Sequence, residues 1–209
     1  LILGSSLGSS SIINLLSADY SFIGEESSDY AGSSVSSAGD VDGDDFDDIL
    51  IGAYGNDDGG TFAGKSYLIL GSSLGSSPII NLLSADYSFI GEGSYDNAGS
   101  SVSSAGDVDG DGFDDILIGA YNNDDGANDA GKSYLIFGSS LGSSFTGYLS
   151  GSDYSFTGGL AADNAGRSVS SAGDIDGDGF DDILIGAPSS DDVASDVGEV
   201  ALFKACPAP

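Results

Sequence analysis

The sequence predicts an all-β protein arranged as a β-propeller-like array of four-stranded antiparallel blades. One observation behind this prediction is a repeat at a spacing of 67 residues, which leaves residues 1–67 and 68–134 nearly identical. Another is that each unit holds four short segments of strand-forming character, separated by Gly, Ser, Asn and Asp. No stretch has the periodicity of a helix. A β-sandwich is the competing architecture, but a strict long repeat favours blades.

The second unit shows how each strand is predicted. Small residues over Ser100–Gly106 suit a strand that packs where space is tight, and the apolar middle of Asp114–Tyr121 indicates a central strand. Ser66–Leu70 is an apolar run ended by glycine, and Tyr87–Gly91 alternates as a half-buried strand would. The intervening GSSLGSS is interpreted as a flexible Gly/Ser connector.

Each blade is expected to run from the small-residue strand through the central and third strands to an outer YSFI-type strand. On this frame the third blade, which ends with a strand at Glu199–Lys204, lacks its outer strand. The N-terminus should supply a short LIL strand and an outer strand at Tyr20–Ile23. The expected divisions are 1–32 for N-terminal strands of an incomplete blade, 33–99 for the first blade, 100–166 for the second, 167–204 for the third and 205–209 for a tail.

The charge balance excludes two classes of partner. Lys and Arg total 4 against 34 acidic residues, which gives a formal net charge of −30. A surface of that sign repels nucleic acid and anionic lipid, so we expect no nucleic-acid partner and no membrane insertion. The sequence also has no apolar run long enough for a transmembrane helix. Because 40% of the residues are hydrophobic, the chain is not a solvated acidic tail.

The ends of the sequence carry few signals. There is no Met and no visible signal peptide, so we interpret the chain as a processed or excerpted segment of a longer one. Cys206 is the single cysteine and cannot form an internal disulfide. A free thiol in a frayed end and an intermolecular bridge both stay open for it.

The turn between the small-residue strand and the central strand concentrates carboxylates. In the second copy it reads DVDGDGFDD, from Asp107 to Asp115, and no cation lies nearby in the sequence. Repulsion among charges this close costs stability unless a counter-ion sits among them. Carboxylates at the first, third and fifth positions turn toward one centre, and the intervening glycines permit the positive φ that this requires. A carbonyl at the seventh position and a carboxylate at the ninth would complete a cage of oxygens.

Such a cage predicts a Ca²⁺ site. Hard oxygen ligands in a flexible loop select Ca²⁺ over Mg²⁺, which demands stricter geometry. His is absent and the only Cys is remote, so zinc or copper would have no ligands. An EF-hand begins similarly but needs a Glu at the twelfth position between two helices. Here the twelfth residue is Ile118, inside a predicted strand, so the EF-hand is rejected.

The segment SVSSAGDVDGDGFDDILIGA resembles the FG-GAP repeat of integrin α-subunit propellers and of many bacterial surface proteins. The resemblance extends over essentially the whole chain in three copies. It implies propeller blades that each hold one Ca²⁺ between their first and second strands. Carried over by position, the implied ligands are Asp40, Asp42, Asp44, the Phe46 carbonyl and Asp48; Asp107, Asp109, Asp111, the Phe113 carbonyl and Asp115; and Asp174, Asp176, Asp178, the Phe180 carbonyl and Asp182.

The sequence departs from the family pattern in three ways. The FG dipeptide is Ala-Gly in every copy, which removes a packing aromatic, and GAP survives only at Gly186–Pro188. Asp45 replaces the expected loop glycine in the first copy. Because Asp tolerates the left-handed conformation better than most residues, we still expect this loop to bind.

A second acidic loop follows the central strand in each unit, at 56–60, 122–131 and 189–198. It is interpreted either as an ordinary solvated loop, in which acidic residues preserve solubility, or as an additional metal or ligand site. Lys65 and Lys132 occupy equivalent positions beside these loops, and we expect them to balance charge locally.

Nothing in the sequence predicts an enzyme. Asp114 with Asp115 and Asp124 with Asp125 are carboxylate pairs, but adjacent strand residues point to opposite faces, so the first pair is poorly arranged for one substrate. There is no His, no nucleophile motif and no phosphate-binding glycine loop. The candidate chemistry also occurs three times, whereas an active site usually occurs once.

Two functions stay open. Near-identical copies favour a calcium-stabilised extracellular structural repeat of a surface fibre, sheath or large adhesin, whose incomplete terminal blades associate head-to-tail with other copies of the chain. The alternative is a calcium-dependent adhesion module that binds a protein or glycan ligand on one propeller face. Tyr54 and Tyr121 could then serve as a stacking platform for sugars. Either function places the chain outside the cell or at the cell surface, where calcium is plentiful.

Overall fold

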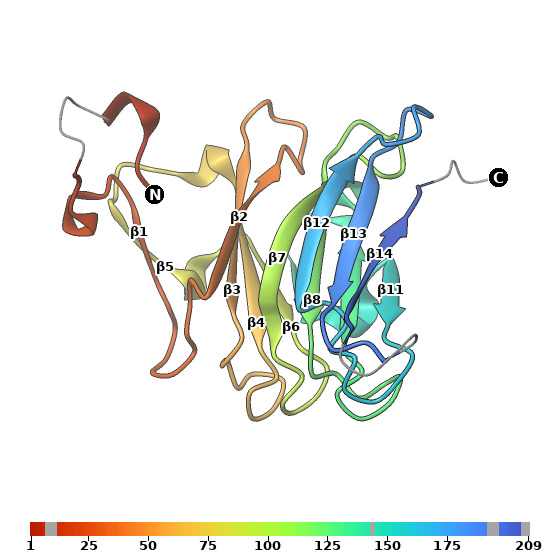
Figure 1. Ribbon diagram of the computed structural model, residues 1–209. Coiled ribbons are helices and arrows are strands. Elements are labelled where there is room, and N and C mark those ends of the chain that lie inside the picture. Colours follow the sequence, from red (N-terminus) through yellow and green to blue (C-terminus); the bar gives the residue numbers. More distant parts are fainter. Residues whose placement is uncertain (7–11, 143–144, 192–196, 206–209) are drawn as a thin grey trace.

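Three antiparallel sheets, one from each repeat, make up most of the computed structural model, which describes residues 1–6, 12–142, 145–191 and 197–205 (Figure 1). The predicted all-β architecture of propeller-like blades is therefore confirmed. The helices are single 3-10 turns at Gly4–Ser6, Leu15–Ser17, Gly71–Ser73, Leu82–Ser84, Gly138–Ser140 and Leu149–Gly151. Over the described residues, no helix has the length and apolar character needed to cross a bilayer.

The strands of each blade follow one another in the predicted order. The first blade consists of β2 (Ser34–Gly39), β3 (Asp48–Ala53), β4 (Lys65–Ile69) and β6 (Tyr87–Ile90). The second consists of β7 (Ala98–Gly106), β8 (Asp115–Ala120), β9 (Lys132–Ile136) and β11 (Tyr154–Thr157). The third holds β12 (Ser168–Gly173), β13 (Asp182–Ala187) and β14 (Glu199–Phe203) and, within the described residues, no outer strand.

The connector between the third and outer strands contains a strand that the sequence analysis missed. Strand β5 (Ile79–Asn81) pairs in parallel with β1 (Ser21–Ile23), and β10 (Phe145–Tyr148) pairs in parallel with β6. Each connector thus covers the outer edge of the preceding unit, which would otherwise expose unpaired backbone groups. The first sheet consequently has five strands, one of them parallel, where four antiparallel strands were predicted.

The predicted N-terminal LIL strand does not form. Leu1 and Tyr20 exchange two backbone hydrogen bonds, of 2.9 and 3.2 Å, but residues 1–3 extend no ladder beyond this pair. In the first blade the equivalent segment forms β4 and pairs with the central strand β3. The outer strand expected at Tyr20–Ile23 is confirmed as β1, one residue shorter.

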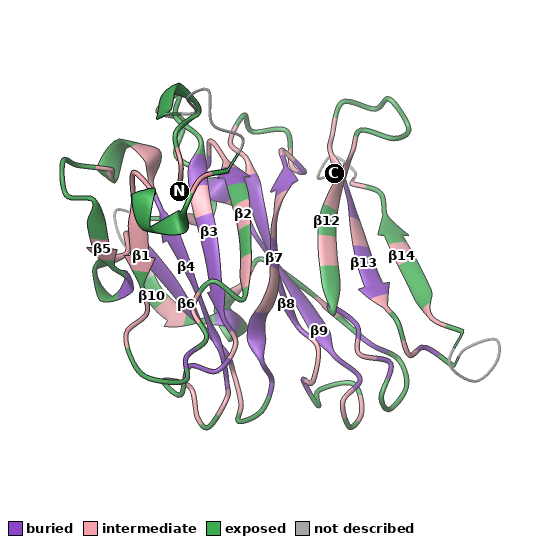
Figure 2. Cartoon of the chain, turned by 60° about the vertical axis from the view of Figure 1, so that its left-hand side comes forward, coloured by how far each residue is buried: buried purple, intermediate pink, exposed green. Residues whose placement is uncertain are grey.

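The blades pack through their sheet faces, with β2, β7 and β12 side by side (Figure 1). One apolar cluster, which includes Leu50, Phe89 and Ile118, joins the first two blades, and a second, which includes Leu117 and Ile185, joins the second to the third. Buried residues are concentrated in β3, β4, β8 and β9, and burial decreases toward β14 and the N-terminal segment (Figure 2). The hydrophobic core therefore lies at the joints between blades.

Small residues allow the backbones of neighbouring blades to come into direct contact. Ser101 in β7 donates its hydroxyl to the Gly166 carbonyl at 2.7 Å, and a Cβ added to Gly119 would lie 2.0 Å from the same oxygen. Ser34 and Gly52 repeat this arrangement one blade earlier, around the Gly99 carbonyl. The contact explains why the first strand and the end of the second consist of Ser, Gly and Ala.

This contact predicts a difference between two equivalent glycines. Gly119→Ala should lower the free energy of unfolding by about 1–3 kcal/mol, because its methyl group would overlap the backbone of the next blade. Gly186→Ala is the matched control, since in the described structure its Cβ would meet only Ser168, whose hydroxyl can rotate away. Thermal unfolding at saturating calcium measures both, and equal losses of stability would contradict the contact.

Candidate metal centres

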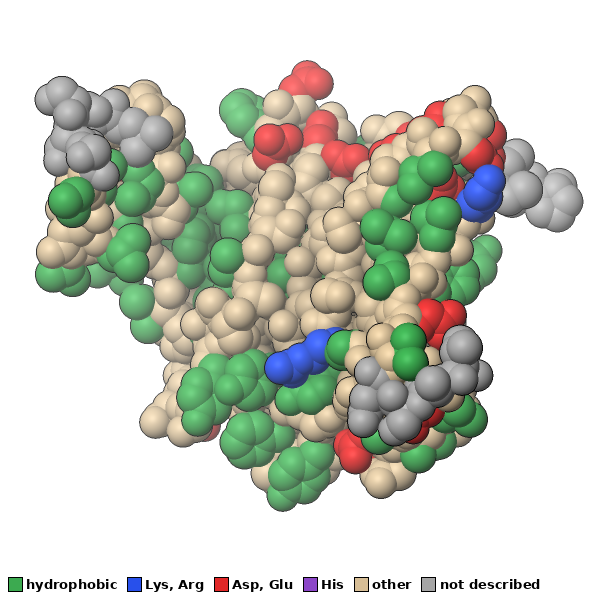
Figure 3. All heavy atoms as spheres, in the orientation of Figure 1, with side chains coloured by type: hydrophobic (Ala, Val, Ile, Leu, Met, Phe, Trp, Pro, Cys, Tyr) green, Lys and Arg blue, Asp and Glu red, His purple; other side chains and the backbone are tan. Residues whose placement is uncertain are grey.

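The three acidic turns lie at one end of the molecule, each between the first and second strands of its blade (Figure 1). Acidic side chains gather over this end in the space-filling view (Figure 3). In each turn three carboxylates converge, with one oxygen from each within 4.8 Å of the others. The converging groups are Asp40, Asp42 and Asp48; Asp107, Asp109 and Asp115; and Asp174, Asp176 and Asp182.

The first carboxylate of each turn organises its backbone. Asp40 accepts backbone hydrogen bonds from Gly43 at 2.7 Å and from Asp44 and Asp45 at 3.0 Å. The tight turn requires left-handed backbone, with φ of 75° at Gly43 and 70° at Asp45. The expectation that Asp45 tolerates this conformation is confirmed, and the first loop folds like the other two. The same three bonds recur on Asp107 and on Asp174.

The ninth-position carboxylate is buried beneath each turn. Asp48 is 1% exposed, and its two oxygens accept the backbone N–H groups of Val41 at 2.9 Å and Gly71 at 2.8 Å. Asp115 and Asp182 make the equivalent pairs of bonds. Each therefore ties the start of its turn to the end of the third strand of the same blade.

Burial also makes these carboxylates costly to ionise. It raises the pKa of Asp48 to about 6 and that of Asp115 to about 7, against the opposing effect of their backbone hydrogen bonds. The neighbouring carboxylates of Asp42 and Asp109, among others, add to this rise. A cation among the three oxygens would remove the repulsion, so the residues present fit a hard divalent ion.

Two of the five predicted ligands in each turn lie outside the converging group. The fifth-position carboxylates of Asp44, Asp111 and Asp178 accept the backbone N–H two residues later, at 2.9 to 3.0 Å. That these carboxylates bind the ion is still a prediction, and the same holds for the carbonyls of Phe46, Phe113 and Phe180. The observed three oxygens leave room in the coordination shell that Ca²⁺ prefers.

A feature that the sequence analysis missed connects each of the first two turns to the following blade. Asp114 accepts the backbone N–H of Asp40 at 2.9 Å and donates its own N–H to the Asp40 carbonyl at 3.0 Å. Asp181 makes the same two bonds with Asp107, at 3.2 and 3.0 Å. The Phe113 ring also covers Gly43, where a Cβ would lie 2.5 Å away. The first two acidic turns are therefore part of the joints between blades.

These bonds also show how the two side chains of Asp114 and Asp115, the carboxylate pair considered for catalysis, are oriented. Asp115 turns into its own blade toward Val108, whereas Asp114 reaches the preceding blade. The expectation that the two side chains diverge is confirmed. The repeated Asp-Asp sequence is the signal for the joint, since the second carboxylate supports its own turn and the first bonds the preceding blade.

The lysines balance charge as expected. Lys65 forms ion pairs with Glu25 at 2.7 Å and Asp58 at 2.8 Å, and Lys132 pairs with Glu92 and Asp125 at 2.9 and 2.7 Å. Burial alone would lower the pKa of each ammonium, but these carboxylates outweigh it and raise the pKa above the ordinary value. The Glu25 and Glu92 pairs each link a lysine to the preceding unit, whereas the Asp58 and Asp125 pairs lie within one blade.

The second acidic loops contribute no residue to the converging carboxylate groups found among the described residues. Asp57 and Asp124 instead accept the backbone N–H of residue 62 and residue 129 at 2.7 Å, which supports the interpretation as ordinary loops. Residues 192–196 of the third such loop and the cysteine Cys206 lie outside the described residues, so the expectations for them stay open.

The tyrosines considered as a sugar platform are partly covered. Tyr54 stacks on Tyr30 with ring centroids 5.0 Å apart, and the Arg167 guanidinium lies 4.3 Å from the centroid of Tyr121. One face of each ring is therefore occupied within the chain.

We expect the effect of calcium on stability to depend on pH. Because the pKa values of Asp48 and Asp115 are raised, the metal-free fold should gain stability as the pH falls from about 7 toward the unfolded-state value of about 4. Ca²⁺ requires the ionised carboxylates, so the rise in melting temperature caused by calcium should shrink from pH 8 to pH 5. A calcium effect that is constant over this range, measured by calorimetry, would contradict the role of these groups.

Two substitutions should separate metal binding from support of the turn. Asp42→Asn should reduce the stabilisation by calcium and slightly raise the melting temperature in chelator, because it removes repulsion within the turn and affects one local contact of 3.2 Å. Asp48→Asn should lower the free energy of unfolding by about 1–3 kcal/mol even in chelator, since one buried backbone N–H loses its acceptor. Identical behaviour of the two variants in chelator would contradict this division.

Comparison with known proteins agrees with this geometry. The FG-GAP repeat family matches residues 31–69, 98–136 and 165–203, which include all three turns. The chain is similar to integrin alpha-5 of Xenopus laevis, with 32% identity over 80% of this chain and 16% of that protein, and to integrin alpha-PS2 of Drosophila melanogaster, with 30% identity over 90% and 13%. It is also similar to integrin alpha-V of Gallus gallus, with 30% identity over 87% and 17%. The chain thus spans about a sixth of the length of these relatives, and it belongs to the FG-GAP repeat family.

Proposed function

We propose that the chain is a calcium-stabilised extracellular repeat of the adhesive, non-enzymatic class, with one Ca²⁺ in each of its three acidic turns. The observation that carries this proposal is the coupling of the first two converging carboxylate groups to the joint with the next blade, through Asp40 and Asp114 and again through Asp107 and Asp181. The similarity to integrin α-subunits supports the adhesive class and the extracellular location.

Calcium would act on both the charge and the geometry of the joints. Three Ca²⁺ ions would change the formal charge from −30 to −24 and remove the repulsion where it is most concentrated. A turn fixed by its ion would also hold the N–H and carbonyl of Asp40 and Asp107 in place for the following blade. An affinity of roughly 10⁻⁴–10⁻³ M, as in extracellular calcium modules, would suffice.

The two end faces of the chain match each other. On the first blade Phe46 is 59% exposed beside Asp47, in the positions from which Phe113 and Asp114 contact the preceding turn. On the third blade Gly173 and Gly177, equivalent to Gly39 and Gly43, meet no described atom within 4 Å of an added Cβ. We propose that the first blade of one copy docks on the third blade of another, with the contacts that already join the blades within the chain.

An apolar hollow beside the first blade belongs to this end face. It has a volume of about 590 Å³ and is lined by Leu1, Phe22, Val35, Phe46 and Ile51, among others. Hydrophobic side chains are visible in this region, between the N-terminal segment and the first blade (Figure 3). Burial of this surface against another blade would add to the hydrogen bonds of the joint.

Recognition of a protein or glycan ligand is the second candidate function. The tyrosines that favoured it each have one ring face covered, and the near-identity of the blades offers little variation for a specific binding face. The structural role is therefore preferred.

Calcium should raise the stability of the whole chain. Loading of all three turns should increase the melting temperature by several degrees relative to EDTA, because the ion binds only the folded turns. Isothermal titration should count three ions per chain, or fewer if sites differ in affinity. Superimposable melting curves in excess Ca²⁺ and in EDTA would refute the proposed function.

Self-association should depend on the matched end faces. At concentrations in the micromolar range and above, with calcium present, light scattering should show particles larger than one chain. Asp47→Arg should shift them toward the monomer, because the guanidinium cannot accept the N–H of Asp174. Glu26→Gln, on an exposed residue away from the end-face joint, is the control. A calcium-loaded wild-type chain that stays monomeric would disprove the docking.

A further inference from the structure

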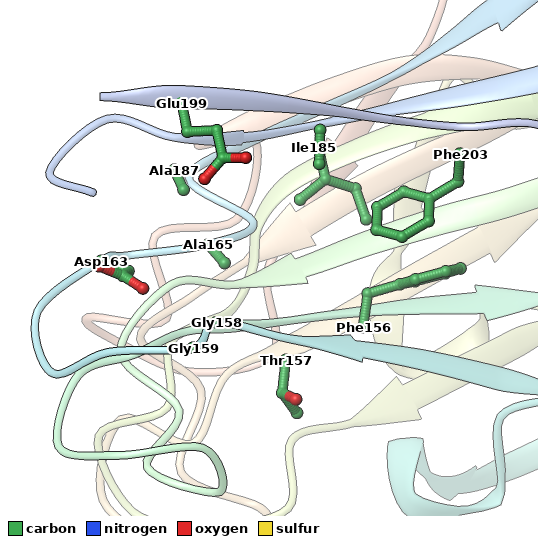
Figure 4. A pocket seen from close by; sticks show the side chains of 11 residues that line it. Phe156, Thr157, Gly158, Gly159, Asp163, Ala165, Ile185, Ala187, Glu199 and Phe203 are labelled. Atoms are coloured by element: carbon green, nitrogen blue, oxygen red, sulfur yellow. The ribbon is translucent and has the colours of Figure 1, made fainter. Parts of the chain in front are cut away.

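A pocket of about 110 Å³ lies between the second and third blades, away from the acidic turns. The outer strand β11 contributes Phe156 and Thr157 to its lining, and β14 contributes Glu199 and Phe203. In Figure 4 the Glu199 carboxylate points from its strand into the space between Ala187 and Ala165, and Asp163 lies at one end of the same pocket. The pocket is thus acidic at one end and apolar at the other.

In the earlier blades the same position is filled by the chain itself. Lys132, the residue equivalent to Glu199, places its ammonium between Glu92 and Asp125 and 5.0 Å from the centroid of the Tyr134 ring. Lys132 and Tyr134 are 7% and 0% exposed, so they fill this place completely. Lys65 and Tyr67 do the same one blade earlier.

The third repeat has lost three of these groups together. Glu199 stands in the position of Lys132, Ala201 in that of Tyr134 and Gly159 in that of Glu92. The first change reverses a charge, and the other two remove a ring and a side chain that walled the ammonium. The result is a cavity that has lost the cation and one carboxylate that paired with it, and that is lined by Asp163 and the new Glu199.

One of these carboxylates has an orphaned oxygen. Asp163 is 4% exposed, and its Oδ2 accepts the backbone N–H of Leu160 at 2.7 Å, but its Oδ1 has no hydrogen-bond partner among the described residues. In the second blade the Asn123 amide bonds the equivalent Asp96 at 2.8 Å, on the same oxygen that accepts the backbone N–H of Gly93. The third repeat has Ser190 in place of that asparagine, and its hydroxyl donates to Glu199 at 3.4 Å instead. A buried carboxylate oxygen without a donor is unfavourable, so it indicates a ligand that donates.

The lining decides which cation fits. The two carboxylates among the described lining residues provide too few oxygens for Ca²⁺, which takes about six to eight. The walls away from them are apolar and include the Phe156 and Phe203 rings, whose centroids are 4.6 Å apart. An alkyl chain that ends in an ammonium matches both parts, with its stem along the rings and its three N–H donors at the carboxylates.

We propose that this pocket binds a primary alkylammonium group of the kind carried by a lysine side chain, with Asp163 and Glu199 as acceptors and Phe156 and Phe203 as the apolar wall. The incoming group takes the place that Lys65 and Lys132 occupy in the other blades. Its source is either a free amine or a lysine of another protein. The binding step involves no calcium turn, so it stands or fails independently of the proposed function.

The test uses the calcium-saturated chain with n-butylammonium and, separately, a short acetylated and amidated peptide that contains one lysine. Titrations at constant ionic strength are followed by NMR through the amide signals of Gly158 and Gly159, which line the pocket. We expect saturable shifts with a dissociation constant of about 1–10 mM for butylammonium. Saturation by the peptide as well would assign the source to protein lysines, and saturation by butylammonium alone would assign it to free amines.

Three variants make the result specific. Glu199→Gln should weaken binding at least about tenfold, because one charged acceptor becomes neutral. Glu199→Lys should abolish binding, since it restores the side chain of the second blade. Glu26→Gln removes a remote exposed charge and should leave the dissociation constant unchanged.

Two outcomes would overturn the proposal. One is linear, unsaturated shifts that are the same in the wild type and in Glu199→Lys, which would indicate diffuse attraction to an acidic surface. The other is displacement of butylammonium by further Ca²⁺ in proportion to its concentration at constant ionic strength, which would make the pocket a metal site.

Discussion

Repulsion among carboxylates in the turn between the first two strands is the constraint on which the other features of this structure depend. Three carboxylate oxygens lie within 4.8 Å in each turn, and one of the three side chains is buried. Backbone N–H groups stabilise part of this negative charge, since Asp40 and Asp48 together accept hydrogen bonds from five of them. A cation bound among the three oxygens would remove the remaining repulsion. A turn fixed by a cation would present its backbone N–H and carbonyl groups to the next blade. The packing of the repeated blades would then depend on metal binding.

The sequence predicted the parts of this design that are local. Alternation and small residues identified the strands of each blade, and the spacing of Asp and Gly identified the turns. It did not reveal β5 and β10, because three or four residues with two apolar side chains are too short a signal for a strand whose partner lies in the preceding unit. It also did not reveal the role of Asp114, since its partner Asp40 is remote in sequence. Contacts between units depend on how the blades stack, and no periodicity within one unit encodes that.

The third repeat shows how such an array can acquire a new property. Its turn keeps the carboxylates of the first two copies, whereas its joint with the second blade has exchanged a lysine for Glu199 and lost the tyrosine ring that walled it. Because the ion pair in the earlier blades is internal and complete, such a change creates a cavity with unbalanced charge rather than a merely weaker joint. Divergence between near-identical repeats is therefore informative where it removes several contacting groups at once.

The central claim is that the ion in each turn stabilises the joint with the following blade. Hydrogen exchange of three backbone amides tests it directly, because Asp40 and Asp107 donate their N–H groups to the next blade while Asp174 has no such acceptor among the described residues. At a concentration at which the chain is monomeric, calcium should slow exchange at Asp40 and Asp107 much more than at Asp174. Equal slowing at all three amides, or no slowing at any, would contradict the claim.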